Sequence, residues 1–152
     1  MKAVPAPHRF RSHGSTTLPL DGRVIVYVED DPCLRRALVK QLSRAGATVR
    51  AAPSVADGLA LHLEGVDVIL SDGHLGDGSA LELLAGLRHL PGAADVPVVV
   101  YTGDTSLSFE RSLLRCGAVV VLWKPLPPQE LSSVLAEVCA FEAHGQLARS
   151  AG

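Results

Sequence analysis

Residues 23–32 read RVIVYVEDDP: a β-branched apolar run, then three acidic residues, then a proline. The run 23–28 predicts a β-strand, and Pro32 suits the first turn of a helix that ends at Gly46. The same order of strand and helix recurs four more times. The other strands are predicted at 47–51, 66–71, 96–101 and 118–122, and the other helices at 54–63, 79–90, 105–116 and 128–143.

Four of these five strands are nearly continuous apolar runs, and only 47–51 is weaker. Such runs are typical of parallel strands that helices cover on both faces. With a right-handed crossover in each unit, the pattern predicts a doubly wound α/β fold, in which five helices flank a five-stranded parallel sheet.

The composition excludes several classes of protein. The chain has 152 residues, 47% of them hydrophobic, and 14 basic against 16 acidic residues give a net charge of −2. This balance argues against a polybasic nucleic-acid binder or membrane-surface binder. No apolar run is long enough for a transmembrane helix. Cys33, Cys116 and Cys139 are widely spaced, so disulfides and zinc sites are not expected, and a reducing cytoplasm is the expected compartment.

The two ends of the chain differ from its middle. Residues 1–21 contain three prolines, and the first twenty hold three basic residues and no acid, so we expect a flexible N-terminal tail. We expect one folded domain at 22–143 and a C-terminal tail at 144–152. So few residues follow the last helix that no helix-turn-helix is expected there, which indicates a stand-alone domain or one excised from a larger protein.

Polar side chains follow four of the five predicted strands. They are Glu29, Asp30 and Asp31 after the first, Asp72 after the third, Thr102 after the fourth and Lys124 after the fifth. In open α/β sheets, the functional crevice lies outside the carboxyl ends of the strands. We therefore expect these side chains to converge there.

Carboxylates that converge in a small crevice repel one another, and Lys124 alone cannot neutralise them. A divalent ion that prefers oxygen ligands can, and Mg²⁺ fits that description. Mg²⁺ beside a lysine and a hydroxyl also suits a phosphoryl group, whose negative charge needs electrostatic stabilisation. One carboxylate near the ion can then act as the nucleophile and form an aspartyl phosphate.

The motifs together resemble the receiver domain of response regulators, a chemotaxis-regulator-like phosphoacceptor of bacterial two-component signalling. The matching pieces are VEDDP at 28–32, DVILSD at 67–72, LGDGS at 75–79, LELL at 81–84, VVVYTG at 98–103, CGA at 116–118 and WKP at 123–125. They span about residues 22–143, almost everything outside the tails. The resemblance implies a flavodoxin-like fold with strand order 2-1-3-4-5.

The resemblance also implies a role for each site residue. Asp72 would be the phosphorylated carboxylate. Glu29, Asp30, Asp72 and the backbone carbonyl of His74 would bind Mg²⁺, with Glu29 acting mainly through water. Lys124, expected to precede a cis bond to Pro125, would pair with a phosphoryl oxygen, and Thr102 would move toward it. Asp31 occupies a variable position and receives no role.

The implied function is phosphoryl transfer from a sensor histidine kinase, or a histidine phosphotransfer protein, onto Asp72. The domain would catalyse its own phosphorylation and dephosphorylation without being a conventional enzyme. A downstream protein would bind the face formed by the fourth helix, fifth strand and fifth helix, and homodimerisation stays open. Neither direct nucleic-acid binding nor membrane binding is expected.

Other interpretations compete with this one. Glu29, Asp30 and Asp31 could be the charged start of a helix, and Asp77-Gly78 is read as a turn. The domain could also be a receiver-like interaction module that is never phosphorylated. A phosphatase of the dehalogenase type is disfavoured, because Asp72 lacks the second acid of a DxD motif.

One position departs from the family pattern. Receivers usually carry Tyr or Phe three residues before the lysine, and here that residue is Val121. A β-branched side chain has no large rotamer swing. Strand alternation directs Tyr101 and Trp123 away from the faces of Thr102 and Lys124, respectively. We therefore expect phosphorylation to move the loop after Thr102 and the fourth helix without a buried aromatic swing.

Overall fold

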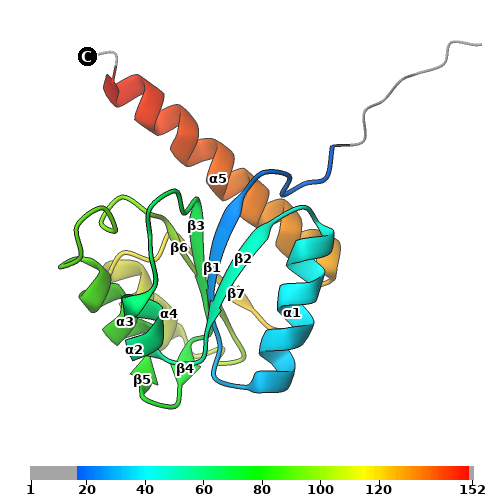
Figure 1. Cartoon of the computed structure of the whole chain (residues 1–152). Helices are drawn as coiled ribbons and strands as arrows, with labels where there is room; N and C mark the ends of the chain where they lie inside the picture. The colour runs from blue at the N-terminus through cyan, green and yellow to red at the C-terminus, as the bar shows by residue number, and fades with distance from the viewer. Residues whose placement is uncertain (1–16, 151–152) are drawn as a thin grey trace, which may run out of the picture.

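A computed structural model describes residues 17–150 and shows a three-layer α/β fold (Figure 1). The main sheet consists of β1 (Val24–Val28), β2 (Thr48–Ala52), β3 (Val68–Ser71), β6 (Val98–Thr102) and β7 (Val120–Trp123). The helices are α1 (Pro32–Arg44), α2 (Val55–Ala60), α3 (Ala80–Leu87), α4 (Leu107–Arg115) and α5 (Pro128–Ser150). All strand pairs of the main sheet are parallel, in the order β2-β1-β3-β6-β7. The predicted doubly wound fold and strand order are confirmed.

Two apolar cores account for the continuous hydrophobic strands. One packs between the sheet and α1 and α5, and the other packs between the sheet and α2, α3 and α4. All five residues of β6 are buried, as expected for a central strand covered on both faces. Successive residues of one strand therefore enter different cores: Val100 lies in the α3–α4 core and Tyr101 in the α1–α5 core.

The ends of two helices differ from the prediction. The second helix ends at Ala60 rather than Leu63, because the extended backbone at Leu61 lets Leu61 and Leu63 turn back against the core. The last helix was predicted to end at Ala143 but continues to Ser150, beyond the body of the domain (Figure 1). Among the described residues, no helix is long and apolar enough to cross a membrane.

The predicted N-terminal tail, 1–21, falls largely outside the described residues, but its last part is packed. Leu20 is fully buried in the α1–α5 core, and its N–H donates to the carbonyl of Ala45, 2.9 Å away. The folded domain thus begins before residue 22.

A short hairpin, β4 (His74–Leu75) with β5 (Gly78–Ser79), follows β3 and was not predicted. Asp77-Gly78 lies at its turn, as expected, but Asp77 also has a longer-range role. Its carboxylate accepts hydrogen bonds from the N–H groups of Val55 (2.9 Å) and Ala56 (3.1 Å) at the start of α2. These bonds lower the pKa of Asp77, and they tie the loop that follows the site to a neighbouring helix.

Candidate functional site: a carboxylate cluster at the carboxyl edge of the sheet

Three carboxylates meet at the carboxyl ends of β1 and β3. These strands are neighbours, with Val28 opposite Ser71, so the residues that follow them are brought together. One carboxylate oxygen from each of Glu29, Asp30 and Asp72 lies within 4.8 Å of the others. The convergence expected from the strand ends is therefore present, and Asp31 is not part of the cluster.

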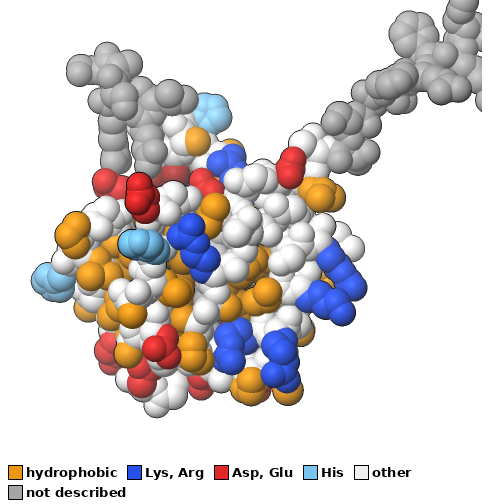
Figure 2. All heavy atoms as spheres, in the orientation of Figure 1, with side chains coloured by type: hydrophobic (Ala, Val, Ile, Leu, Met, Phe, Trp, Pro, Cys, Tyr) orange, Lys and Arg blue, Asp and Glu red, His pale blue; other side chains and the backbone are white. Residues whose placement is uncertain are grey.

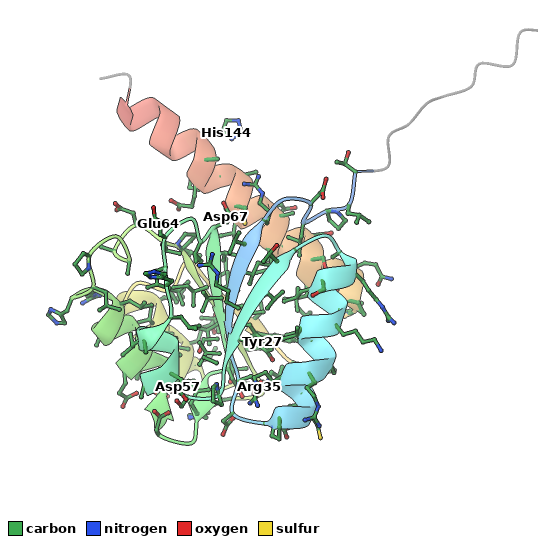
Figure 3. All side chains as sticks on the ribbon, viewed as in Figure 1. Tyr27, Arg35, Asp57, Glu64, Asp67 and His144 are labelled. Atoms are coloured by element: carbon green, nitrogen blue, oxygen red, sulfur yellow. The ribbon has the colours of Figure 1, made fainter. Side chains whose placement is uncertain are left out.

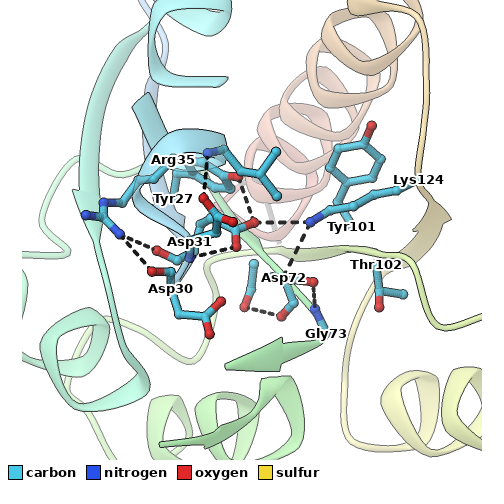
Figure 4. Close-up of polar contacts among 12 residues, drawn as sticks. Tyr27, Asp30, Asp31, Arg35, Asp72, Gly73, Tyr101, Thr102 and Lys124 are labelled. Atoms are coloured by element: carbon cyan, nitrogen blue, oxygen red, sulfur yellow. Dashed lines mark hydrogen bonds and ion pairs between the residues drawn. The ribbon is translucent and has the colours of Figure 1, made fainter. Parts of the chain in front are cut away.

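Among the described residues, Lys124 supplies the one cation that contacts the carboxylates of this cluster (Figure 4). Its Nζ lies 3.1 Å from Glu29 Oε2 and 3.4 Å from Asp72 Oδ2. Its backbone N–H donates to the carbonyl of Thr102 (2.8 Å), which holds it beside β6, and its peptide bond to Pro125 is cis, as the resemblance implied. One ammonium group against three carboxylates leaves the site short of positive charge.

Glu29 is the buried member of the cluster, with 1% of its surface exposed. Burial raises the pKa of Glu29, while its hydrogen bond from Lys124 acts in the opposite direction. Tyr27 OH also donates to Glu29 Oε2 (3.1 Å), and the pKa of Tyr27 is raised by its own burial and then by the Glu29 charge. A buried carboxylate shared by a lysine and a tyrosine is stabilised further by each additional cation that reaches it.

Hydrogen bonds to its backbone hold the loop between β1 and α1 in place. Arg35 NH1 donates to the carbonyls of Glu29 (2.8 Å) and Asp30 (3.4 Å), as Figure 4 shows. Asp31 caps α1, because its carboxylate accepts from the N–H groups of Cys33 (2.8 Å) and Leu34 (3.0 Å). Of the three consecutive acids, only Asp31 has the helix-start role considered as the alternative.

Thr102 closes the other side of the crevice. It is buried at the end of β6, and its Oγ1 accepts a hydrogen bond from Asp104 N–H (3.1 Å). Gly73 lies directly against it: a Cβ at position 73 would clash with Thr102 Oγ1 and lie 2.7 Å from its Cβ. The N–H of Gly73 donates to Asp72 Oδ1 (2.6 Å). Because residue 73 has no side chain, Thr102 can pack directly against the loop that carries Asp72.

The side chain of His74 makes its contacts outside the cluster of Glu29, Asp30 and Asp72. Its Nε2 lies 2.7 Å from Asp104 Oδ2, and its ring stacks on Phe109 of α4, with centroids 4.6 Å apart and an interplanar angle of 14°. Hydrogen bonds from His74 and then from Ser106 lower the pKa of Asp104 to about 2. We call His74, Asp104 and Phe109 the His74 cluster; it joins the loop after Asp72 to the first turns of α4.

The residues near Lys124 also clarify the unusual position 121. Val121 is partly buried in the α3–α4 core, where Phe109 also packs. Tyr101 lies in the opposite core, as predicted, and its hydroxyl accepts from Leu126 N–H (2.9 Å). Trp123 is 43% exposed. Phe109 is thus the aromatic side chain that lies against both the Asp72 loop and the core around Val121.

Sequence reasoning missed four residues that shape the site: Tyr27, Arg35, Gly73 and Phe109. A signal existed for Tyr27, since strand alternation places it on the same face as Glu29. Arg35 acts on backbone carbonyls, and Phe109 acts through a ring stack between α4 and β4. Neither contact has a sequence pattern that would reveal it.

The donor set suits a hard divalent cation. Three carboxylate oxygens, one of them on the exposed Asp30, leave room for retained water, which is the coordination that Mg²⁺ prefers. A doubly wound sheet with such a cluster and a lysine at its carboxyl edge is the arrangement of an α/β domain that handles phosphoryl groups.

Comparisons with known proteins agree. The family described as the response regulator receiver domain matches residues 25–136. The transcriptional regulatory protein GltR of Pseudomonas aeruginosa is 32% identical over 133 residues, which cover 87% of this chain and 54% of GltR. An uncharacterized 14.6 kDa protein of Leptolyngbya boryana is 30% identical over 76% of this chain and 88% of its own length. A crystal structure of a CheY-like receiver domain protein from Methanospirillum hungatei JF-1 gives a TM-score of 0.73 at 26% identity and covers 81% of this chain and 98% of that one.

The chain therefore belongs to the response regulator receiver domain family. It is a CheY-like receiver domain of two-component signalling, with the phosphoacceptor role of that family. Receiver domains of response regulators interact with histidine kinases and with downstream effectors, and they bind Mg²⁺ through acidic residues such as those clustered here.

Proposed function

We propose that Asp72 is the phosphoryl acceptor, and the contact with Lys124 is the observation that carries this assignment. Asp72 is partly exposed, follows the central strand β3 and lies 3.4 Å from an ammonium group. Glu29 also contacts Lys124, but it is buried and hydrogen-bonded to Tyr27. Asp30 is exposed and has no contact with the lysine among the described residues. Asp72 alone combines access for a donor with a cation beside it.

In the proposed reaction, a carboxylate oxygen of Asp72 attacks the phosphorus of a phosphohistidine. The new P–O bond forms as the P–N bond breaks, and the leaving imidazole takes up a proton. Lys124 neutralises charge on the transferred oxygens. Glu29, Asp30, Asp72 and the backbone carbonyl of His74 would hold Mg²⁺, which supplies the remaining charge stabilisation.

Thr102 would link this chemistry to the surface. Its Oγ1 accepts from Asp104 N–H in this structure, so a movement toward a phosphoryl oxygen disturbs that bond. Asp104 in turn holds His74, and His74 stacks on Phe109. We propose that phosphorylation reaches α4 through the His74 cluster, since Val121 provides no aromatic side chain in β7.

The downstream partner would bind the face formed by α4, β7 and α5. Large apolar side chains are exposed on these elements or directly beside them: Leu107, Leu114, Val119, Trp123 and Phe141. Val119 and Phe141 line one groove between β7 and α5, and a contiguous exposed apolar surface of this kind supports a protein-interaction site. A homodimer through the same face would compete with the partner.

The assignment of Asp72 is tested by intact-mass spectrometry after incubation with acetyl phosphate and Mg²⁺. We expect one phosphoryl adduct on the unmodified chain and none on Asp72→Asn, with Asp77→Asn as the matched control that keeps the adduct. An adduct that persists in Asp72→Asn would contradict the proposal. No adduct on the unmodified chain would favour the alternative, an interaction module that is not phosphorylated.

A further inference from the structure

A second concave surface lies at the opposite edge of the sheet from Asp72. It is a hollow of about 730 Å³, lined by the residues before β3 and β6, the turn around Gly65 and the second half of α5. Figure 3 shows Glu64 and Asp67 at this edge, beneath the projecting part of α5. The receiver reaction described above does not use this surface.

The hollow carries an excess of negative charge. Its lining includes four carboxylates, on Glu64, Asp67, Asp95 and Glu142, and one guanidinium, on Arg23. Arg23 pairs with Asp67 at 3.6 Å, and Asp67 also accepts from the N–H of Val24. The other three carboxylates have no ion-pair partner within residues 17–145. Acidic side chains gather along this edge in Figure 2, although basic ones are also visible beside it, and further basic ones lie over the side formed by α1. Arg50 is one basic residue near the rim, since its guanidinium donates to the carbonyl of Glu64 (3.4 Å).

Between the carboxylates the lining is apolar. Pro97 is buried, Val66 and Val96 are partly buried, and Cys139 is 3% exposed. Burial raises the pKa of the Cys139 thiol to about 11, so it is neutral at physiological pH. A ligand that matches this surface therefore has cationic groups on either side of an apolar one.

The chain itself contains such a segment. Residues 1–16 hold three basic residues, Lys2, Arg9 and Arg11, and no acidic one, and the two arginines flank Phe10. The segment joins the domain at the same edge of the sheet as the hollow: Leu18 lies against Gly46 ahead of β2, Pro19 lines the groove between α1 and α5, and Arg23 lines the hollow. The six residues from Arg11 to Thr17 can span about 20 Å when extended, which is enough to cross this edge of a small domain.

We propose that residues 8–13 of the same molecule dock into this acidic hollow, with Phe10 against its apolar lining and Arg9 and Arg11 beside Glu64, Asp95 and Glu142. A short tether gives an effective concentration in the millimolar range, so modest contacts suffice. The groove between α1 and α5 is not an alternative seat, since Lys40 and Arg44 line it and repel a basic segment. Docking at this edge leaves the Asp72 edge accessible.

The test is hydrogen–deuterium exchange on the full-length chain. Relative to the unmodified chain, R9E/R11E should exchange roughly fivefold faster at 63–67 and 92–97, the loss expected for about two exposed ion pairs. The control R111E/R115E on α4 changes the net charge equally and should leave these segments unchanged. Adding E64R/D95R to R9E/R11E reverses the charges on both sides and should restore the protection.

Three outcomes would overturn the proposal. Equal exchange in the unmodified chain and R9E/R11E would show that the basic segment does not cover the hollow. The same loss in R111E/R115E would reduce the effect to net charge. Protection that increases with protein concentration would assign the docked segment to a second copy of the chain. Phosphorylation of Asp72 is measured separately, so failure here leaves the receiver assignment unaffected.

Discussion

On its α1 side the proposed phosphorylation site is held by buried charged contacts, whereas on its α4 side it is held by partly exposed hydrogen bonds and a ring stack. Glu29, Tyr27 and Lys124 form the first set, with Glu29 almost inaccessible to water. His74, Asp104 and Phe109 form the second, and the His74 side chain is 60% exposed. Buried networks are costly to rearrange, and exposed contacts are not. We therefore expect the chemistry on the α1 side and the movement on the α4 side.

The largest effect should come from removing Lys124, the cation on the α1 side of the site. Lys124→Ala leaves Glu29 and Asp72 without their ammonium partner, so we expect phosphorylation by acetyl phosphate to slow on the order of 100-fold. Lys40→Ala is the matched control, because Lys40 lies on α1 without a carboxylate partner among the described residues. Equal rates in the two variants would remove Lys124 from the reaction.

The close packing of Gly73 against Thr102, between the two sides, can be broken by a substitution at Gly73. In Gly73→Ala the new Cβ meets Thr102, which β6 and Asp104 hold in place, and we expect a loss of about 1–3 kcal/mol in the free energy of unfolding. Gly103→Ala is the control, since a Cβ there meets nothing within 4 Å. Urea denaturation measures both. A Gly73→Ala protein as stable as Gly103→Ala would show that Thr102 yields freely.

Two adjacent acids on the α1 side, Asp30 and Asp31, should have different effects, the first on Mg²⁺ binding and the second on stability. Asp30→Ala should weaken Mg²⁺ binding at least about tenfold, read from Trp123 fluorescence, with little change in stability. Asp31→Ala should keep Mg²⁺ binding and lose about 1 kcal/mol of stability, because it removes the cap of α1. The reverse pattern would place the metal ligands one residue further along the chain.

The smallest effect concerns the α4 side of the site. Phe109→Leu removes the stack on His74, worth about 1 kcal/mol, and should speed amide exchange in the first half of α4 roughly fivefold while leaving Asp72 phosphorylation unchanged. Leu107→Ala, on the same helix but 60% exposed, is the control. Unchanged exchange in Phe109→Leu would show that the stack does not restrain α4.

The two sides also differ in how far they can be predicted from sequence. Glu29, Asp30, Asp72, Thr102 and Lys124 lie at strand ends, and parallel topology brings strand ends together whatever the loops do. The continuous apolar strands likewise predict the sheet and its two cores. The His74 cluster depends on loop conformations, and the β4–β5 hairpin on two-residue strands, for which no periodic pattern exists. The end of α5 was missed because residues 144–152 were predicted to be a C-terminal tail, yet the helix continues to Ser150.

Amide exchange with and without beryllofluoride, in the presence of Mg²⁺, compares the two sides directly. The fluoride complex stands in for the phosphoryl group on Asp72. We predict altered exchange at 103–116, where the loop and α4 lose the contacts of the His74 cluster, and nearly constant exchange along the first turns of α1. Unchanged exchange at 103–116 would contradict the proposed coupling through the His74 cluster and favour an interaction module that does not respond to phosphorylation.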